Sequence, residues 1–209
     1  MNRRLDYTFP SDNEWGIPML DASQQGCLLP APFMAWGSIA RPTRMPGCYH
    51  FYVDDSKFSA LWNDPATVLL TQCAAVVEPN FSSGDQTPLA RVIWDVYRKR
   101  WMARYWQSQG VKLIVDLNVA DAFQKVNLIG VPRGWTAFAT RYTSRGGIEA
   151  IERQAQAAHE HTGVQANVVV YSGGREIRDR CLNRGWQWFP NQASWHRNES
   201  KRQSKSSIS

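Results

Sequence analysis

The feature that most constrains this fold is a regular alternation, from Tyr49 onward, of short apolar runs with stretches of helical periodicity. The apolar runs are rich in β-branched and aromatic residues, and several lack polar alternation, as strands covered on both faces do. Repeated strand–helix–strand units require right-handed crossovers, so the pattern predicts an α/β fold with a mainly parallel sheet of about five strands. The candidate strands are Tyr49–Asp54, Ala74–Glu78, Val111–Leu117, Trp135–Arg141 and Asn167–Ser172.

Helix signals lie between these strands. Thr87 as N-cap and Pro88 at the first helical position begin the longest predicted helix, which ends at Gly110. Others are expected over Gly147–Thr162, Arg175–Arg184, Ser56–Asn63 and Pro65–Gln72. An open sheet is the first expectation. A partial TIM-like barrel, completed by the N-terminal segment or by Trp186–Phe189, is the alternative, because five strands are too few for the usual eight-stranded barrel.

Composition divides the chain into three regions. Residues 1–48 hold six of the eleven prolines, so we expect an irregular strap packed on the domain, with one short strand near Ile17–Leu20. Residues 49–196 are the predicted α/β domain. Residues 197–209 are a predicted disordered basic tail, which carries +3 of the net charge of +6.

No apolar leader opens the sequence and no run approaches the roughly 18 apolar residues of a membrane span, so a cytoplasmic location is expected. The four cysteines lack metal-binding or disulfide-framework spacing and are expected to be buried thiols.

Acidic residues follow three of the predicted strands, at the ends where ligands gather in parallel sheets and barrels. The candidate catalytic carboxylates are Asp54, Asp55, Glu78 and Asp116. If the strand ends are neighbours, these groups would favour a cation, and oxygen ligands suit Mg²⁺ or Mn²⁺ for phosphoryl chemistry. The same residue types are ordinary helix caps and turn formers, so a structural role is the competing interpretation.

Two glycine-rich turns open helices after the fourth and fifth predicted strands. Glycine lets backbone N–H groups approach an anion, and a helix N-terminus favours negative charge, so both turns predict contacts with a nucleotide or nucleic-acid phosphate. Neither turn matches a P-loop or a dinucleotide fingerprint, and plain turn chemistry is the alternative. The candidate ligand-binding residues are Asn80, Ser82, Asn118, Arg141, Arg145, Gly146, Gly147, Ser172, Gly173, Gly174 and Arg175.

The predicted helix over residues 88–109 interleaves basic and aromatic residues, a pattern that can follow a phosphate backbone and stack bases. The candidate nucleic-acid-binding residues are Arg98, Lys99 and Arg104, together with Lys201 and Arg202 of the tail. The alternative is an amphipathic core helix whose Asp95 forms ion pairs with neighbouring basic side chains.

Tryptophans gather near the C-terminal end, at positions 186, 188 and 195. Because Trp is enriched in binding hot spots, an exposed patch there would indicate a module that docks on a host protein. A nucleic-acid- or nucleotide-associated role ranks first, with this non-catalytic docking role as the alternative.

Several motifs stand in the order of a known family, and with them the chain resembles the family called domain of unknown function 4417. The resemblance covers roughly residues 15–175 and is most specific over residues 78–112. It implies a phage or mobile-element origin and brings no activity. The family pattern usually has Asp where this chain has Asn80. The motifs are Phe51–Asp55, Pro79–Ser82, Val96–Trp101, Tyr105–Gln107 and Gly110–Lys112.

Overall fold

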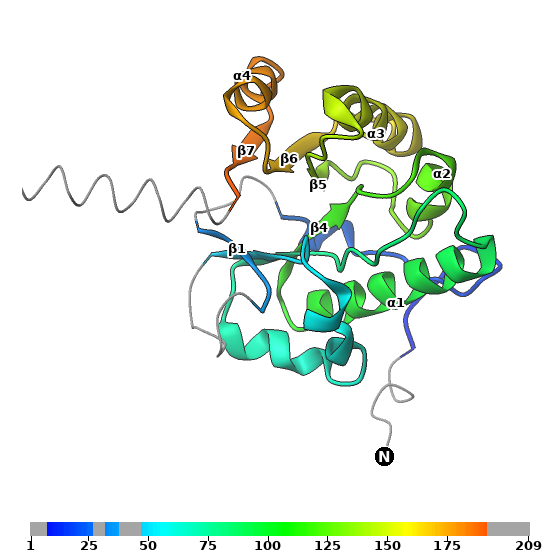
Figure 1. The fold of residues 1–209 in the computed structure, drawn as a ribbon. Helices are drawn as coiled ribbons and strands as arrows, with labels where there is room; N and C mark the ends of the chain where they lie inside the picture. Colours follow the sequence, from blue (N-terminus) through cyan, green and yellow to red (C-terminus); the bar gives the residue numbers. More distant parts are fainter. Residues whose placement is uncertain (1–7, 27–31, 38–46, 192–209) are drawn as a thin grey trace, which may run out of the picture.

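The computed structural model describes residues 8–26, 32–37 and 47–191, which contain seven strands in one parallel sheet (Figure 1). The strands are hydrogen-bonded in sequence order, from β1 to β7, and every neighbouring pair is parallel. All five predicted strands are confirmed. Their bounds, with the two further strands, are β1 Phe33–Ala35, β2 Cys48–His50, β3 Ala75–Val77, β4 Lys112–Asp116, β5 Ala137–Arg141, β6 Asn167–Tyr171 and β7 Gln187–Phe189.

The first and last strands meet through their side chains. The Phe33 ring of β1 stacks on the Phe189 ring of β7, with centroids 4.8 Å apart, and also contacts Tyr171 of β6 at 6.0 Å. The sheet is therefore a nearly closed barrel with an aromatic interior. Both candidates for completing a barrel contribute, because the strap supplies β1 and the Trp186–Phe189 segment supplies β7.

The short strand predicted near Ile17–Leu20 is wrong. The Asn13 side chain donates to the Ile17 carbonyl at 2.8 Å and accepts from the Ile17 N–H at 3.0 Å. Because one amide side chain satisfies both backbone groups, this segment has no need of a strand partner there.

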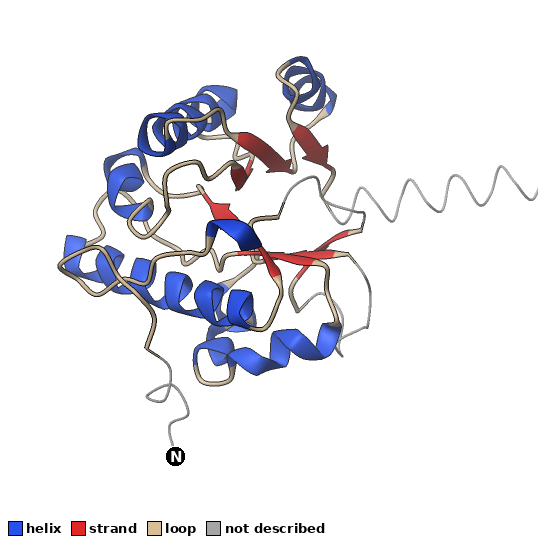
Figure 2. Ribbon diagram, turned by 180° about the vertical axis from the view of Figure 1, so that it is seen from behind, coloured by secondary structure: helices blue, strands red, loops and turns tan. Residues whose placement is uncertain are grey.

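Helices lie around the outside of the strands (Figure 2). The three long predicted helices are confirmed, whereas the two shorter ones are 3₁₀ segments. Thr87 does not cap the longest helix: Pro88 is its N-cap, and the Thr87 hydroxyl accepts from the Gly84 N–H. The helices are α1 Leu89–Ser108, α2 Gln124–Asn127, α3 Gly147–Thr162 and α4 Arg175–Asn183, with 3₁₀ segments at Ala22–Gln24, Asp55–Lys57, Ser59–Trp62, Pro65–Thr71 and Asp121–Phe123.

A buried ion pair fixes α1 on the barrel wall. Glu78 directly follows β3, Arg100 lies on α1, and both side chains are fully buried. The Arg100 guanidinium also donates to the carbonyls of Asn127 at 2.7 Å and Ile129 at 3.0 Å. One arginine thus links α1, the end of β3 and the segment at α2.

The three described cysteines, Cys48, Cys73 and Cys181, are free and buried. Over the described ranges, the structure contains no helix with both the length and the apolar character needed to cross a membrane.

We expect Glu78→Gln to lower the free energy of unfolding by about 3–5 kcal/mol, because it leaves the Arg100 charge buried without its counterion. Urea unfolding measures this change. The control is Asp121→Asn, which breaks the exposed Arg153–Asp121 pair and should cost at most about 1 kcal/mol. Equal losses in the two variants would contradict a dominant role for the buried pair.

Candidate functional site

Three polar aromatic side chains converge inside the barrel at the carboxyl ends of the strands. The His50 ring of β2 contacts the Tyr171 ring of β6, with centroids 4.1 Å apart, although β2 and β6 are not neighbours in the sheet. Both rings therefore lie in the barrel interior. Tyr52, two residues beyond His50, stacks on Tyr171 at 5.9 Å. Alternate residues of an extended segment face the same side, which explains why His50 and Tyr52 share the interior.

His50 is a neutral hydrogen-bond donor. Its side chain is fully buried, and this burial lowers the pKa of His50 to about 3. The Tyr52 backbone N–H donates to its Nδ1 at 3.3 Å, so the single proton of the neutral ring belongs on Nε2. No described atom is a partner for Nε2. The ring therefore offers an unused N–H inside the barrel.

Tyr52 is a second unused donor. Its side chain is only 6% exposed, and burial, followed by the nearby Asp116 carboxylate, raises the pKa of Tyr52 well above 10. The hydroxyl consequently stays protonated. It has no partner in hydrogen-bonding geometry within the described part of the chain, even though the carboxylate is close.

Asp116, the last residue of β4, is the buried charge of this site, and its oxygens already have donors. The Asn80 amide donates to Oδ2 at 3.0 Å, and the Asn118 N–H donates to Oδ1 at 3.0 Å. The Lys99 ammonium of α1, 3.4 Å from Oδ2, supplies the countercharge. Asn80 and Asn118 also bond each other, which ties the ends of β3 and β4 together.

A strained turn adjoins the aromatic cluster directly after β6. Ser172 and Gly173 have φ values of +74° and +91°, a region that costs energy for Ser172. The Ser172 N–H donates to the Phe189 carbonyl at 2.8 Å. By contrast, none of the described residues accepts from the N–H groups of Gly173 and Gly174, which precede the first turn of α4. The turn therefore presents unused donors at a helix N-terminus.

The other glycine turn is different. The N–H groups of Gly146 and Gly147 both donate to the Thr143 carbonyl, at 3.2 and 3.1 Å. Those amides are satisfied within the turn that opens α3, so they are not available to an anion as the structure stands. Arg145 lies exposed beside this turn, and Arg141, at the end of β5, is exposed and in register with Tyr171.

The remaining carboxylates have partners of their own, and Glu78 also accepts from the Asp116 backbone N–H at 3.3 Å. Asp54 caps a 3₁₀ segment by accepting from the Ser56 N–H at 2.9 Å, and hydrogen bonds from Ser56 lower the pKa of Asp54. Asp55 accepts from the Ser82 hydroxyl at 2.8 Å, joining the loops after β2 and β3. Glu78 is held by Arg100. Within the described ranges no group of three His, Cys, Asp or Glu residues is placed to hold a metal ion. The predicted carboxylates therefore do not form a set of Mg²⁺ ligands there.

The predicted basic residues of α1 do not form an exposed row. Lys99 is 3% exposed and faces Asp116. Arg98 pairs with Asp95, and its guanidinium lies 3.9 Å from the centre of the Phe81 ring. Arg104 is half-buried, with its guanidinium 5.5 Å from the Phe9 ring. Lys201 and Arg202 of the predicted tail lie outside the described residues.

The C-terminal tryptophans are mostly covered. Trp186 is 8% exposed, and Trp188 is half-buried and donates its indole N–H to the Ser172 carbonyl at 2.8 Å. Trp195 lies outside the described residues. Trp188 thus supports the strained turn, and Trp186 and Trp188 offer little surface for docking.

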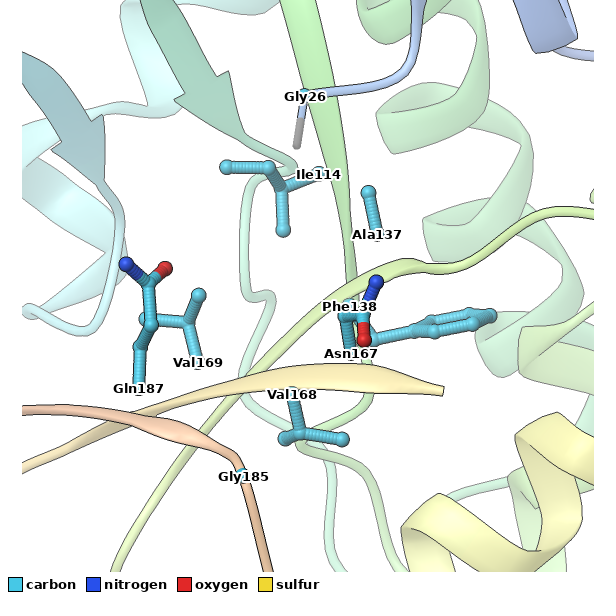
Figure 3. A pocket seen from close by; sticks show the side chains of 9 residues that line it. All are labelled: Gly26, Ile114, Ala137, Phe138, Asn167, Val168, Val169, Gly185 and Gln187. Carbon is cyan, nitrogen blue, oxygen red and sulfur yellow. The ribbon is translucent and has the colours of Figure 1, made fainter. Parts of the chain in front are cut away.

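A separate hollow of about 220 Å³ lies at the opposite, amino end of the barrel (Figure 3). Its walls are mainly aliphatic side chains and glycine backbone, including Ile114, Val169 and Gly26. Neither His50 nor Tyr52 is among the residues that line it.

The family model described as Domain of unknown function (DUF4417) matches residues 9–157. The chain belongs to this family. The match includes His50, Tyr52 and Asp116 and ends before β6, so the turn at Ser172 lies beyond it.

Two phage proteins are similar to the DUF4417 chain. Each is called Gene 1 protein, one from Mycobacterium phage D29 and one from Mycobacterium phage L5, and each is 34% identical over 115 residues, or 53% of this chain. The alignment spans 42% and 49% of their lengths, less than half of either relative. No solved structure matches the chain significantly.

Sequence reasoning missed His50 and Tyr52 as site residues. The available signal was their spacing of two on an extended segment, which places both on one face. Whether their hydrogen-bond donors have acceptors depends on contacts across the barrel, which the spacing does not show.

The buried His50 predicts acid sensitivity. Between pH 6.5 and about 3 the unfolded chain binds a proton at this histidine that the folded protein does not, so stability falls as the pH is lowered. The expected slope from this group is about 1.4 kcal/mol per pH unit. Urea unfolding across this range should show a shallower dependence for His50→Asn than for the wild type. Identical dependences would contradict a neutral, buried His50.

Proposed function

We propose that the protein binds a small phosphorylated ligand, with a nucleotide as the first candidate, over the carboxyl ends of the barrel strands. The observation that carries the proposal is the pair of N–H groups at Gly173 and Gly174, which have no acceptor among the described residues. The interior side chains of His50 and Tyr52 lie near this turn. Tyr171 joins the two parts, because it precedes the turn and its ring contacts both interior side chains.

The turn has the chemistry of an anion site. Successive backbone N–H groups in a turn of positive φ make a concavity that attracts anions, and the dipole of the following helix adds to the attraction. Barrel enzymes commonly place phosphate in this position, after a late strand and at the N-terminus of a helix. The strain at Ser172 is consistent with a turn shaped for binding.

Arg141 supplies a nearby positive charge. It lies exposed at the end of β5, in register with Tyr171, and is close enough to Tyr52 to oppose the rise in that tyrosine's pKa. Guanidinium groups bind phosphate through paired hydrogen bonds. Arg175 lies at the start of α4 and pairs only loosely with Asp179, at 3.8 Å. Two arginines therefore flank the turn.

The arrangement favours a single small ligand over a long polyanion. Lys99 is buried, and Arg98 is neutralised by Asp95, so the described part of α1 offers little free positive charge to a phosphate backbone. The name of the phage relatives, Gene 1 protein, assigns no ligand. The proposal accordingly rests on the turn and the barrel interior.

We expect Arg141→Gln to raise the Kd for inorganic phosphate about tenfold, because a charge-assisted hydrogen bond contributes about 1.5 kcal/mol or more. Isothermal titration calorimetry at one fixed, low ionic strength measures this. Arg145→Gln is the matched control, since it removes the same charge beside the turn whose amides are satisfied, and it should change Kd less than twofold. Equal effects of the two substitutions, or no phosphate binding by the wild type, would sink the proposal.

A further inference from the structure

We infer that the ligand carries, besides its phosphate, a carbonyl-type oxygen that accepts hydrogen bonds from His50 and Tyr52 inside the barrel. This inference rests on the proposed phosphate site and specifies the class of ligand that the site takes. It concerns two side chains that phosphate binding at the Ser172–Gly174 turn does not use.

Neither donor has an acceptor in hydrogen-bonding geometry in the described part of the protein, although the Asp116 carboxylate lies close to the Tyr52 hydroxyl. Buried polar groups nearly always have hydrogen-bond partners, and leaving one unpaired costs stability. Here two such groups lie two residues apart on one face of one segment. The Asp116 carboxylate, which lies near Tyr52, already accepts from Asn80 and Asn118 and pairs with Lys99. An acceptor from outside the chain would satisfy both donors at once.

The charge of the surroundings selects an uncharged acceptor. His50 and Tyr52 are both neutral donors, and the nearby Asp116 carries a negative charge that Lys99 balances. A second anion placed inside the barrel would meet that carboxylate in a poorly solvated interior. A carbonyl oxygen accepts two hydrogen bonds without adding a charge. The phosphate therefore belongs at the turn and the carbonyl in the interior.

The walls around the donors favour a planar group. Phe33 stacks on His50 at 4.5 Å and on Phe189 at 4.8 Å, and Tyr171 lies across His50 and Tyr52. Tyr171, like Phe33 and Phe189, is partly exposed, and rotation of its side chain would open a path to both donors. Phosphate esters with a carbonyl oxygen come from two sources, namely keto bases of nucleotides and keto sugar phosphates.

Matched probes test the inference by calorimetry on the full chain. Inosine monophosphate is compared with adenosine monophosphate, whose base has an amino group in place of the single keto oxygen. Dihydroxyacetone phosphate is compared with glycerol 3-phosphate, which has a hydroxyl instead. We expect the keto member of one pair to bind about tenfold more tightly, the effect of about one hydrogen bond. The pair that shows this difference identifies whether the keto oxygen belongs to a base or to a sugar phosphate.

Tyr52→Phe should reduce this preference to twofold or less and leave the Kd for inorganic phosphate unchanged. Removing an unpaired buried hydroxyl should also raise the thermal midpoint by about 2–4 °C for a chain of this length. Tyr97→Phe, a half-buried tyrosine on α1, is the control and should change neither the preference nor phosphate binding.

Equal affinities within both pairs, with inorganic phosphate still bound, would overturn the carbonyl inference and leave the phosphate site standing. A lower thermal midpoint in Tyr52→Phe would also overturn it, because the hydroxyl would then have a partner, such as a buried water, in the free protein. Absence of binding by every phosphate-bearing probe would overturn the proposed function together with the inference.

Discussion

The contact between β2 and β6 across the barrel interior is the interaction on which the site depends. Neighbouring strands of a parallel sheet hold each other by backbone hydrogen bonds, but only side chains can join strands on opposite walls. The packed rings of His50, Tyr171 and Phe33 do this, and Phe189, stacked on Phe33, extends the contact to β7. The same side-chain contacts therefore close the barrel and position the interior donors.

Two buried ion pairs balance the charged side chains at this end of the barrel. Glu78 points outward to Arg100 and holds α1 on the wall, whereas Asp116 points inward and is balanced by Lys99. Both pairs run from a strand end to the same helix, so α1 positions the strand ends from which the site is built. Because these charges are already matched, the interior that remains for a ligand is lined by neutral donors. Arg141 adds an exposed positive charge at the rim.

The sequence predicted the repeating strand–helix pattern well, because each strand from β2 to β6 is a local apolar run with its own turn residues. Barrel closure was only an alternative, since β1 and β7 have three residues each and meet through a ring contact between distant segments. The acidic strand ends were correctly located in the chain but do not form one cluster, because side-chain direction alternates: Glu78 faces out and Asp116 faces in. The two glycine turns looked alike in sequence, and only the Thr143 carbonyl distinguishes them.

The most direct measurement is an NMR titration of the uniformly ¹⁵N-labelled protein with inorganic phosphate, following the backbone amides of the glycines. The account predicts saturable shifts at Gly173 and Gly174, whose N–H groups have no described acceptor, and little change at Gly146 and Gly147, whose N–H groups are bonded to Thr143. Shifts confined to Gly146 and Gly147, or no saturable shift at either turn, would contradict a phosphate site at the carboxyl end of β6.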